Sequence, residues 1–307
     1  MKLFIIRLFT VLLPVVLILI GWEILMRRAP HAFTYKRKII MENCRKNGKL
    51  LVLGSSHSYF GVKTDVIPHA YNLAFVSQDL VYDRFIFETF LSAHHQLEYL
   101  VMPISIFSFF DNAEELEAWR KGLYVRYWKY PADKFWDSFF IFDNLPHQLE
   151  QYRKTRKRIR RKGMLQAFNM SITGWGDDQT VLPRNEVFTQ IAKKAAARHC
   201  NRNLQHISGF YEVEKIISLA HKNKIKVILF TPPAHKLYCD NLNPDQEKKM
   251  RELLVKLQQS PGVFYLDLLR SKQFEDQDFG DADHLSEQGA EKLARILYNY
   301  ALQTPAI

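Results

Sequence analysis

Two short segments of the chain carry the residue types of a nucleophile and of its acid–base partners. Residues 51–58 read Leu-Val-Leu-Gly-Ser-Ser-His-Ser, an apolar strand followed by a turn of small residues that presents Ser56. A serine hydroxyl placed in this way can attack a carbonyl when a base and oxyanion donors lie beside it. Asp281 and His284 stand three residues apart near the chain end, so the carboxylate can orient the imidazole. Each segment alone also fits a turn, a solvated loop or a helix cap, but the pair predicts a triad of Ser56, His284 and Asp281.

A parallel sheet would bring these residues together, and the chain alternates short apolar runs with helical patterns. The pattern predicts strands at residues 50–53, 71–74, 99–105, 226–231 and 263–268, and helices at 78–94, 186–199, 210–222, 244–259 and 286–302. The expected fold class is α/β, with a five-stranded parallel, doubly wound, flavodoxin-like sheet. Such folds bind their ligands outside the carboxyl ends of the strands, where Ser56 is expected.

The first residues form a candidate membrane anchor. Residues 3–26 are almost continuously apolar, and at about 1.5 Å per residue they span a hydrocarbon layer of roughly 30 Å. A cleaved signal peptide and a buried core helix are the alternatives, but the run ends in Arg27 and Arg28 without a small-residue cleavage site. We therefore expect an anchor with short flanks at residues 1–28, a polar linker at 29–47 and an α/β domain at 48–303.

The net charge of +11 is concentrated in two segments. Residues 1–50 hold ten basic and two acidic residues, and residues 119–165 hold thirteen and four. Two local patches suit anionic lipid head groups or an anionic polymer, whereas a nucleic-acid-binding domain more often spreads basic residues over its main body. The three distant cysteines exclude a disulfide framework and a four-cysteine zinc site. We expect no cofactor and no metal.

Residues 106–185 interrupt the alternation and predict a largely helical insertion between the third and fourth strands. The segment holds an aromatic group followed by the basic run at residues 153–162; the aromatic residues are Trp119, Tyr124, Tyr127, Trp128, Tyr130, Phe135, Trp136, Phe139 and Phe140. The basic run fits a solvated helix face, contact with anionic lipid or a polyanionic substrate, or nucleic-acid binding. Because no stacking module or groove-reading motif accompanies the run, we expect no nucleic-acid partner. We expect the insertion to form a lobe beside the site.

Together, the two chemical segments resemble the SGNH (GDSL-like) hydrolase superfamily over roughly residues 48–108 and 205–303. Gly54-Ser55-Ser56 matches the nucleophile block of that superfamily, and Asp281 and His284 match its Asp-x-x-His block. The resemblance implies a serine hydrolase fold with Ser56 as nucleophile.

The superfamily blocks that supply the oxyanion hole depart from their usual pattern here. Ala74 stands near the position of the superfamily glycine, and Ser105 is the local side-chain donor where its asparagine is missing. The oxyanion candidates are therefore Ser56, Ala74 and Ser105. His57 adjoins the nucleophile and is an alternative base, although a residue next to the serine usually points away from it.

A membrane anchor combined with these blocks also resembles envelope acyl-transfer proteins, such as the D-alanyl transfer protein of lipoteichoic acid and alginate O-acetylation proteins. The resemblance implies a serine esterase or O-acyltransferase acting on a cell-envelope glycan or related polymer. The expected partners are the lipid bilayer, this polymer and a membrane-bound acyltransferase. The alternative is a catalytically silent module that binds a glycan or scaffolds a membrane complex. An envelope polymer requires an extracytoplasmic domain, whereas the basic residues after the apolar run favour a cytoplasmic one.

Overall fold

The computed structural model describes residues 2–110, 118–178 and 180–305. These residues belong to two compact units: unit 1 comprises Met1–Tyr35 and Glu117–Phe168, and unit 2 comprises Lys36–Leu116 and Asn169–Ile307. Unit 2 contains the sheet, and unit 1 contains the apolar N-terminal helix and much of the expected insertion.

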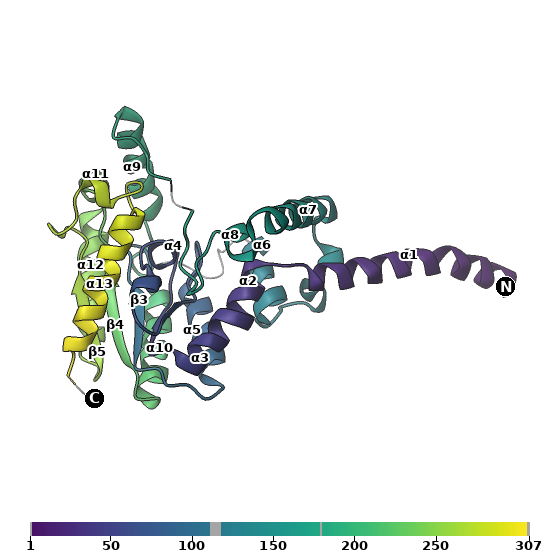
Figure 1. The fold of residues 1–307 in the computed structure, drawn as a ribbon, viewed down its shortest axis with the longest axis horizontal. Helices are drawn as coiled ribbons and strands as arrows, with labels where there is room; N and C mark the ends of the chain where they lie inside the picture. The colour runs from purple at the N-terminus through teal and green to yellow at the C-terminus, as the bar shows by residue number, and fades with distance from the viewer. Residues whose placement is uncertain (1, 111–117, 179, 306–307) are drawn as a thin grey trace. The chain divides into compact units, whose positions relative to one another are not determined.

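The sheet of unit 2 confirms the expected fold class. Its strands are β1 (Leu50–Val52), β2 (Ala70–Asn72), β3 (Tyr99–Pro103), β4 (Lys226–Thr231) and β5 (Val263–Asp267). All pairs are parallel, and the order is β2-β1-β3-β4-β5 (Figure 1). This is the flavodoxin-like order, in which the direction of winding reverses at β1. With Ser56 after β1 and Asp-x-x-His after β5, the fold is SGNH-like, as the resemblance implies.

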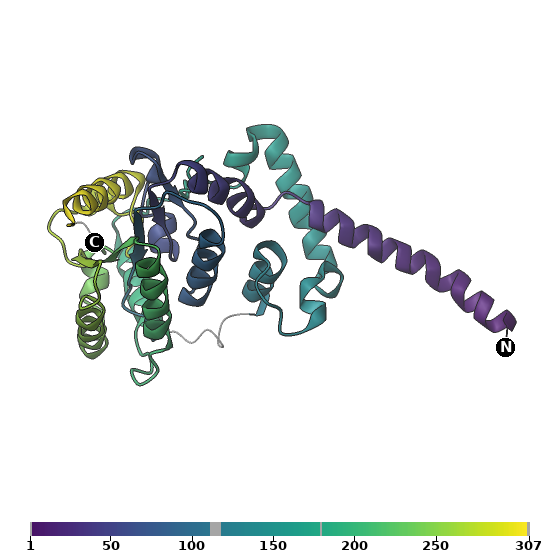
Figure 2. The ribbon, with the colours of Figure 1, turned by 90° about the horizontal axis from the view of Figure 1, so that it is seen from below.

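Helices flank the strands on both sides (Figure 2). The helices of unit 2 are α3 (Met41–Asn47), α4 (Ser56–Tyr59), α5 (Leu80–Leu91), α9 (Glu186–His199), α10 (Ser208–Lys222), α11 (Lys236–Cys239), α12 (Pro244–Leu257) and α13 (Glu287–Gln303). Side-chain caps begin several of them; the Ser286 hydroxyl, for example, accepts a hydrogen bond from the Gly289 amide at the start of α13.

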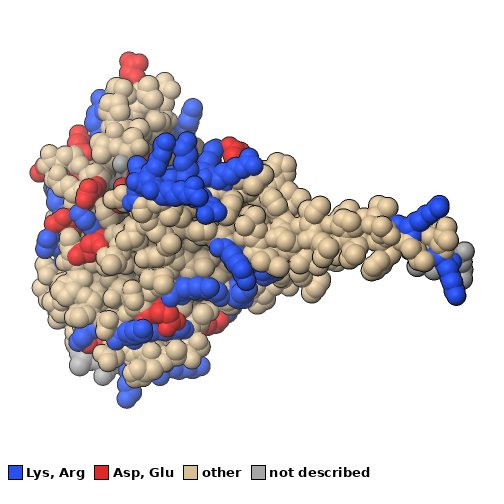
Figure 3. Space-filling model, turned by 45° about the vertical axis from the view of Figure 1, so that its right-hand side comes forward, with Lys and Arg blue, Asp and Glu red and all other residues tan. Residues whose placement is uncertain are grey.

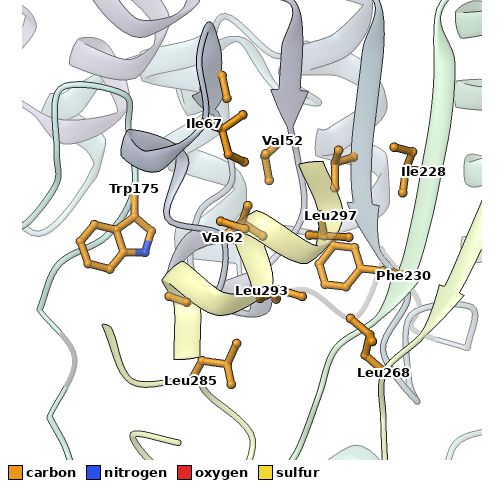
Figure 4. Packing of buried hydrophobic residues seen from close by; sticks show 14 of the residues in the cluster. Val52, Val62, Ile67, Trp175, Ile228, Phe230, Leu268, Leu285, Leu293 and Leu297 are labelled. Carbon is orange, nitrogen blue, oxygen red and sulfur yellow. The ribbon is translucent and has the colours of Figure 1, made fainter. Parts of the chain in front are cut away.

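The core lies between α13 and the middle strands (Figure 4). Val52, Ile228 and Phe230 face Leu293 and Leu297 of α13 in one buried cluster. The intervening strand residues point to the opposite face and are buried as well, as Leu51 and Leu229 show. A sheet buried on both faces explains why the strands read as continuous apolar runs rather than as alternating ones.

Residues 29–47, expected to be a polar linker, are largely helical. They form α2 (Ala32–Tyr35), a π-helical turn at Lys36–Ile40 and α3. Ile40, Met41 and Cys44 are buried, and so is the side chain of Lys36, which donates to the Ala74 carbonyl at 2.5 Å and lies over the rings of Tyr59 and Phe75. The charged residues in this stretch hid the buried apolar residues Ile40, Met41 and Cys44.

The described part of the expected insertion is mostly helical and is divided between the units. Unit 1 holds α6 (Ala118–Leu123), α7 (Leu145–Lys162) and α8 (Met164–Ala167), together with short turns. Residues 169–178 belong to unit 2, where the Asn72 amide donates to the Thr173 carbonyl beside the edge strand β2. Residues 111–117 and the side chain of Trp119, which the sequence assigned to the insertion, lie outside the described residues.

Helix α1 (Lys2–Arg28) is long and apolar enough to span a membrane. Its most apolar stretch is not buried by the described residues, whereas a core helix would be mostly buried.

Candidate active site

The turn after β1 is held in place by a buried carboxyl group. Gly54 has φ +117°, a conformation that side chains rarely adopt, and its amide donates to Asp83 Oδ1 at 2.8 Å. The Gln78 amide group donates to the same oxygen at 2.6 Å. Burial raises the pKa of Asp83 to about 7, although both hydrogen bonds act in the opposite direction. This anchor fixes where Ser56 begins α4.

Three side chains meet at the carboxyl edge of the sheet, as the sequence predicts. Ser56 Oγ lies 2.8 Å from His284 Nε2. The other ring nitrogen, Nδ1, lies 2.9 and 3.0 Å from the two carboxylate oxygens of Asp281. This is the relative placement of nucleophile, base and orienting carboxylate in a serine triad.

A tight loop before α13 brings Asp281 and His284 together. Phe279 and Leu285 form an antiparallel bridge, and the Gly280 amide donates to the His284 carbonyl at 2.9 Å. The Asp281 carboxylate also accepts from the backbone amide of His284 at 2.8 Å. Because the carboxylate is fixed by its own loop, it is ready to orient the imidazole.

The imidazole of His284 is mostly buried but reaches a pocket of about 260 Å³. Phe60 and Leu182 contribute apolar surface to this pocket, and Asp281 contributes polar surface. Burial of the ring opposes its protonation, but the hydrogen bond with Asp281 and the charges of Asp283 and Asp281 outweigh it. The pKa of His284 is therefore raised above its ordinary value of 6.5.

Two of the three expected oxyanion donors have other partners in this structure. The Ala74 amide donates to Asn72 Oδ1 at 2.9 Å, so it can bind an oxyanion only by giving up that bond. Ser105 Oγ lies 2.8 Å from His57 Nδ1. The Ser56 amide lies in the first turn of α4, where N–H groups lack acceptors within the helix. These contacts argue against Ala74 and Ser105 and leave Ser56 as the candidate donor.

A buried polar cluster behind the candidate triad is the main feature that the sequence did not predict. Asp283 Oδ2 lies 3.8 Å from His57 Nε2 and 3.8 Å from His199 Nδ1. The His57 ring is stacked on that of His284, and His199 Nδ1 lies 2.9 Å from the hydroxyl of Tyr238. Both ring nitrogens of His57 thus face groups other than Ser56, which argues against His57 as the base.

The charges within this cluster are unequal. Burial lowers the pKa of His199 to about 3, so that imidazole is neutral at physiological pH. Burial alone would raise the pKa of Asp283, but contact with His57 and the charge of His284 hold it well below its ordinary range. Asp283 is therefore a buried carboxylate beside three imidazoles.

His57, Asp283 and His284 each offer a ligand atom, and these atoms lie within 4.8 Å of one another. Imidazole and carboxylate groups suit zinc. However, a metal ion bound there would draw on the same His284 imidazole that contacts Ser56 and Asp281. The geometry therefore favours a charged layer behind the triad over a metal centre.

Replacing Gly54 with alanine should destabilise the protein and displace Ser56. An added Cβ would lie 2.4 Å from the Pro103 ring. The alanine would also have to keep the positive φ of Gly54, which side chains rarely adopt. We expect a loss of at least about 2 kcal/mol in the free energy of unfolding, measured by denaturant titration. Gly163→Ala is the matched control, because Gly163 also has a positive φ but nothing lies within 4 Å of its Cβ position. Equal losses in the two variants would contradict a role for the Pro103 contact.

Comparisons with known proteins give one family match and several distant structural similarities. Residues 33–300 match the profile of a family described as "Protein of unknown function (DUF1574)". No curated protein matches the chain. One similar structure is described as a candidate platelet activating factor from Streptococcus pneumonia. The alignment covers 95% of this chain and 98% of that protein, with 9% sequence identity and a TM-score of 0.43. A GDSL-like lipase from Bacteroides thetaiotaomicron matches 88% of this chain over 98% of its length, with 11% identity and a TM-score of 0.41.

Proposed function

The chain belongs to the DUF1574 family, and we propose that it is a membrane-anchored serine esterase or O-acyltransferase. The observation that carries the proposal is the continuous contact from Ser56 Oγ through the His284 ring to the Asp281 carboxylate. A serine hydroxyl is a weak nucleophile until an adjacent base accepts its proton.

In the proposed reaction, Ser56 Oγ attacks an ester carbonyl while His284 Nε2 takes the hydroxyl proton. Asp281 holds the Nδ1–H tautomer and stabilises the imidazolium cation. The Ser56 amide donates to the oxyanion. Collapse of the tetrahedral intermediate breaks the ester bond, and the imidazolium returns its proton to the departing alcohol. Water or an acceptor hydroxyl then attacks the acyl-serine, with His284 again as the base.

We propose a small acyl group as the transferred unit, held in the pocket that His284 reaches; Ser56 itself does not line this pocket. At about 260 Å³, it lies just below the volume that usually encloses a drug-sized ligand. The anchor and the basic helix α7 support a substrate at a membrane surface, and we propose an envelope glycan or related acylated polymer, with a membrane-bound acyltransferase as a further partner. Labelling of the full chain by a fluorophosphonate, followed by hydrolysis assays with acetyl and longer esters, tests the reaction class and the acyl size.

The alternative is a catalytically silent SGNH-like module that binds a glycan or scaffolds a membrane complex. The observation that favours it is the engagement of the Ala74 amide by Asn72, because loss of one oxyanion donor costs about 3 kcal/mol of transition-state stabilisation. Glycan binding by a chain that a fluorophosphonate does not label would support this alternative.

The rate of fluorophosphonate labelling should rise with pH through a midpoint above 6.5. Only neutral His284 can accept the serine proton, and the pKa of His284 is raised, so the protonated, inactive form persists to higher pH than for an ordinary histidine. Labelling rates measured from pH 5 to 9 on the full chain give the midpoint. A rate that is independent of pH over this range would contradict His284 as the base.

We propose that unit 2 lies outside the cytoplasmic membrane, because an envelope polymer is accessible only there. The basic residues that follow α1 favour the opposite orientation, so sidedness needs a direct measurement. A C-terminal alkaline phosphatase fusion should be active, and a matching fluorescent protein fusion should be dark. An inactive phosphatase fusion together with a fluorescent partner would place unit 2 in the cytoplasm.

A further inference from the structure

The last two turns of α1 are bonded into residues 138–148 of unit 1. Trp22 Nε1 donates to the Gln148 side chain at 3.1 Å, and the Phe140 amide donates to Glu23 Oε2 at 2.8 Å. Arg27 donates to the Ser138 carbonyl at 3.1 Å and pairs with Glu23 at 2.6 Å. The point at which the apolar helix leaves the membrane is therefore fixed relative to residues 138–148.

Four aromatic residues in this segment or just before it, Phe135, Trp136, Phe139 and Phe142, are here termed the aromatic cluster. Phe139 contacts both Phe135 and Phe142, and the Arg27 guanidinium lies over its ring. Phe135, Trp136 and Phe142 are nevertheless 79%, 52% and 66% exposed. Large aromatic side chains next to the end of a membrane helix are typical of the bilayer–water interface, where the ring replaces water with lipid.

Helix α7 starts just after this cluster and holds about half of the Lys and Arg residues of unit 1. It holds eight Lys and Arg residues and one Glu, and none of its residues is buried. Gln148 of α7 accepts from Trp22 of α1 and donates to the carbonyl of Phe140, the residue that follows Phe139 of the cluster. In Figure 3, Lys and Arg side chains gather over α7, whereas most of the length of α1 is free of charged side chains.

We propose that unit 1 is a membrane-interface lobe, in which the aromatic cluster enters the head-group region and α7 lies on anionic head groups of the same leaflet. The bonds to Trp22, Glu23 and Arg27 hold both features at the level where α1 leaves the bilayer. A basic helix at that level meets anionic lipid before any other polyanion, and each well-placed basic residue adds attraction there. If α1 were cleaved as a signal peptide, residues 22–27 would be removed and these bonds to residues 138–148 would be lost.

The experiment uses the full chain in nanodiscs, labelled with a fluorophore at a single introduced cysteine. The native Cys44, Cys200 and Cys239 are buried, so Trp136→Cys and Lys162→Cys can be labelled selectively. The quencher is a phosphatidylcholine that carries a nitroxide on its head group. We expect strong quenching at position 136 in phosphatidylcholine alone. At position 162, quenching should become several-fold stronger when phosphatidylglycerol makes up half of the lipid.

A charge-neutralised α7 tests the cause of this quenching. Replacing Arg156, Lys157, Arg158, Arg160 and Arg161 with glutamine should abolish the phosphatidylglycerol-dependent quenching at position 162 and leave that at position 136 unchanged. The matched control neutralises five exposed lysines of unit 2, namely Lys222, Lys224, Lys248, Lys256 and Lys272, and should change neither signal. Weak quenching at position 136 would overturn the proposal, and so would weak quenching at position 162 in anionic nanodiscs. An equal loss of quenching at position 162 in the two five-fold variants would also overturn it. All of these signals are independent of catalysis.

Discussion

Replacing Ser56 with alanine should abolish covalent labelling of the full chain by a fluorophosphonate. The reagent forms its bond with an activated serine oxygen, and Ser56 Oγ is the hydroxyl that lies 2.8 Å from His284 Nε2. Ester hydrolysis should fall by about 10⁶-fold, the size of the loss when a triad serine is removed. The measurement is in-gel fluorescence of the labelled protein, with the labelled peptide identified by mass spectrometry.

Ser55→Ala is the matched control for this variant. Ser55 precedes Ser56 and is the N-cap residue of α4, but its side chain makes no capping hydrogen bond there. We therefore expect the Ser55 variant to keep both labelling and hydrolysis, with unfolding behaviour similar to that of Ser56→Ala. Labelling that survives in Ser56→Ala, or that is lost in Ser55→Ala alone, would contradict the assignment of the nucleophile. Failure of the unchanged protein to label would favour the silent module.

The sheet could be predicted from sequence because local and tertiary signals agree in it. Residues 226–231 are apolar and rich in β-branched side chains, and β4 has the predicted bounds. The strand next to Ser56 ends at Val52, one residue earlier than predicted; Leu53 is apolar and buried like the strand residues before it, which extended the prediction. Residues 36–47 misled the prediction because their lysines and arginines conceal buried Ile40 and Cys44. Burying Lys36 requires a carbonyl and two rings from segments distant in sequence, which local patterns do not reveal.

The candidate triad could be predicted because its members lie in short segments with recognisable spacing. The cluster behind it could not, because His57, His199 and Asp283 come from three separate elements and meet only after the sheet is assembled. Asp283 is also one of several acidic residues between 275 and 283. Its burial distinguishes it from the exposed ones, and burial cannot be read from this run of residues. The bond between the Ala74 amide and the Asn72 side chain could not be predicted for a similar reason, because it forms only when β2 and the turn after it are in place.

Two carboxylates flank His284, and replacing Asp281 with asparagine should be far more damaging than the same change at Asp283. In Asp281→Asn, the side-chain oxygen can still accept the backbone amide of His284, but the new NH₂ group favours a tautomer whose Nδ1 is an acceptor. Nε2 would then carry the proton and could not accept one from Ser56. We expect labelling and hydrolysis to fall by about 10⁴-fold, the loss typical of a wrong tautomer in a triad.

Asp283→Asn should leave the tautomer intact, because Asp283 Oδ1 lies 3.8 Å from His284 Nδ1, too far for a hydrogen bond. Its negative charge nevertheless helps to raise the pKa of His284. Removing that charge should therefore lower the midpoint of the pH–rate profile while the rate at high pH falls by less than about tenfold. Rates from pH 5 to 9 for both variants separate the two roles. A larger loss in Asp283→Asn, with an unshifted midpoint, would make Asp283 the orienting carboxylate and reverse the assignment of Asp281.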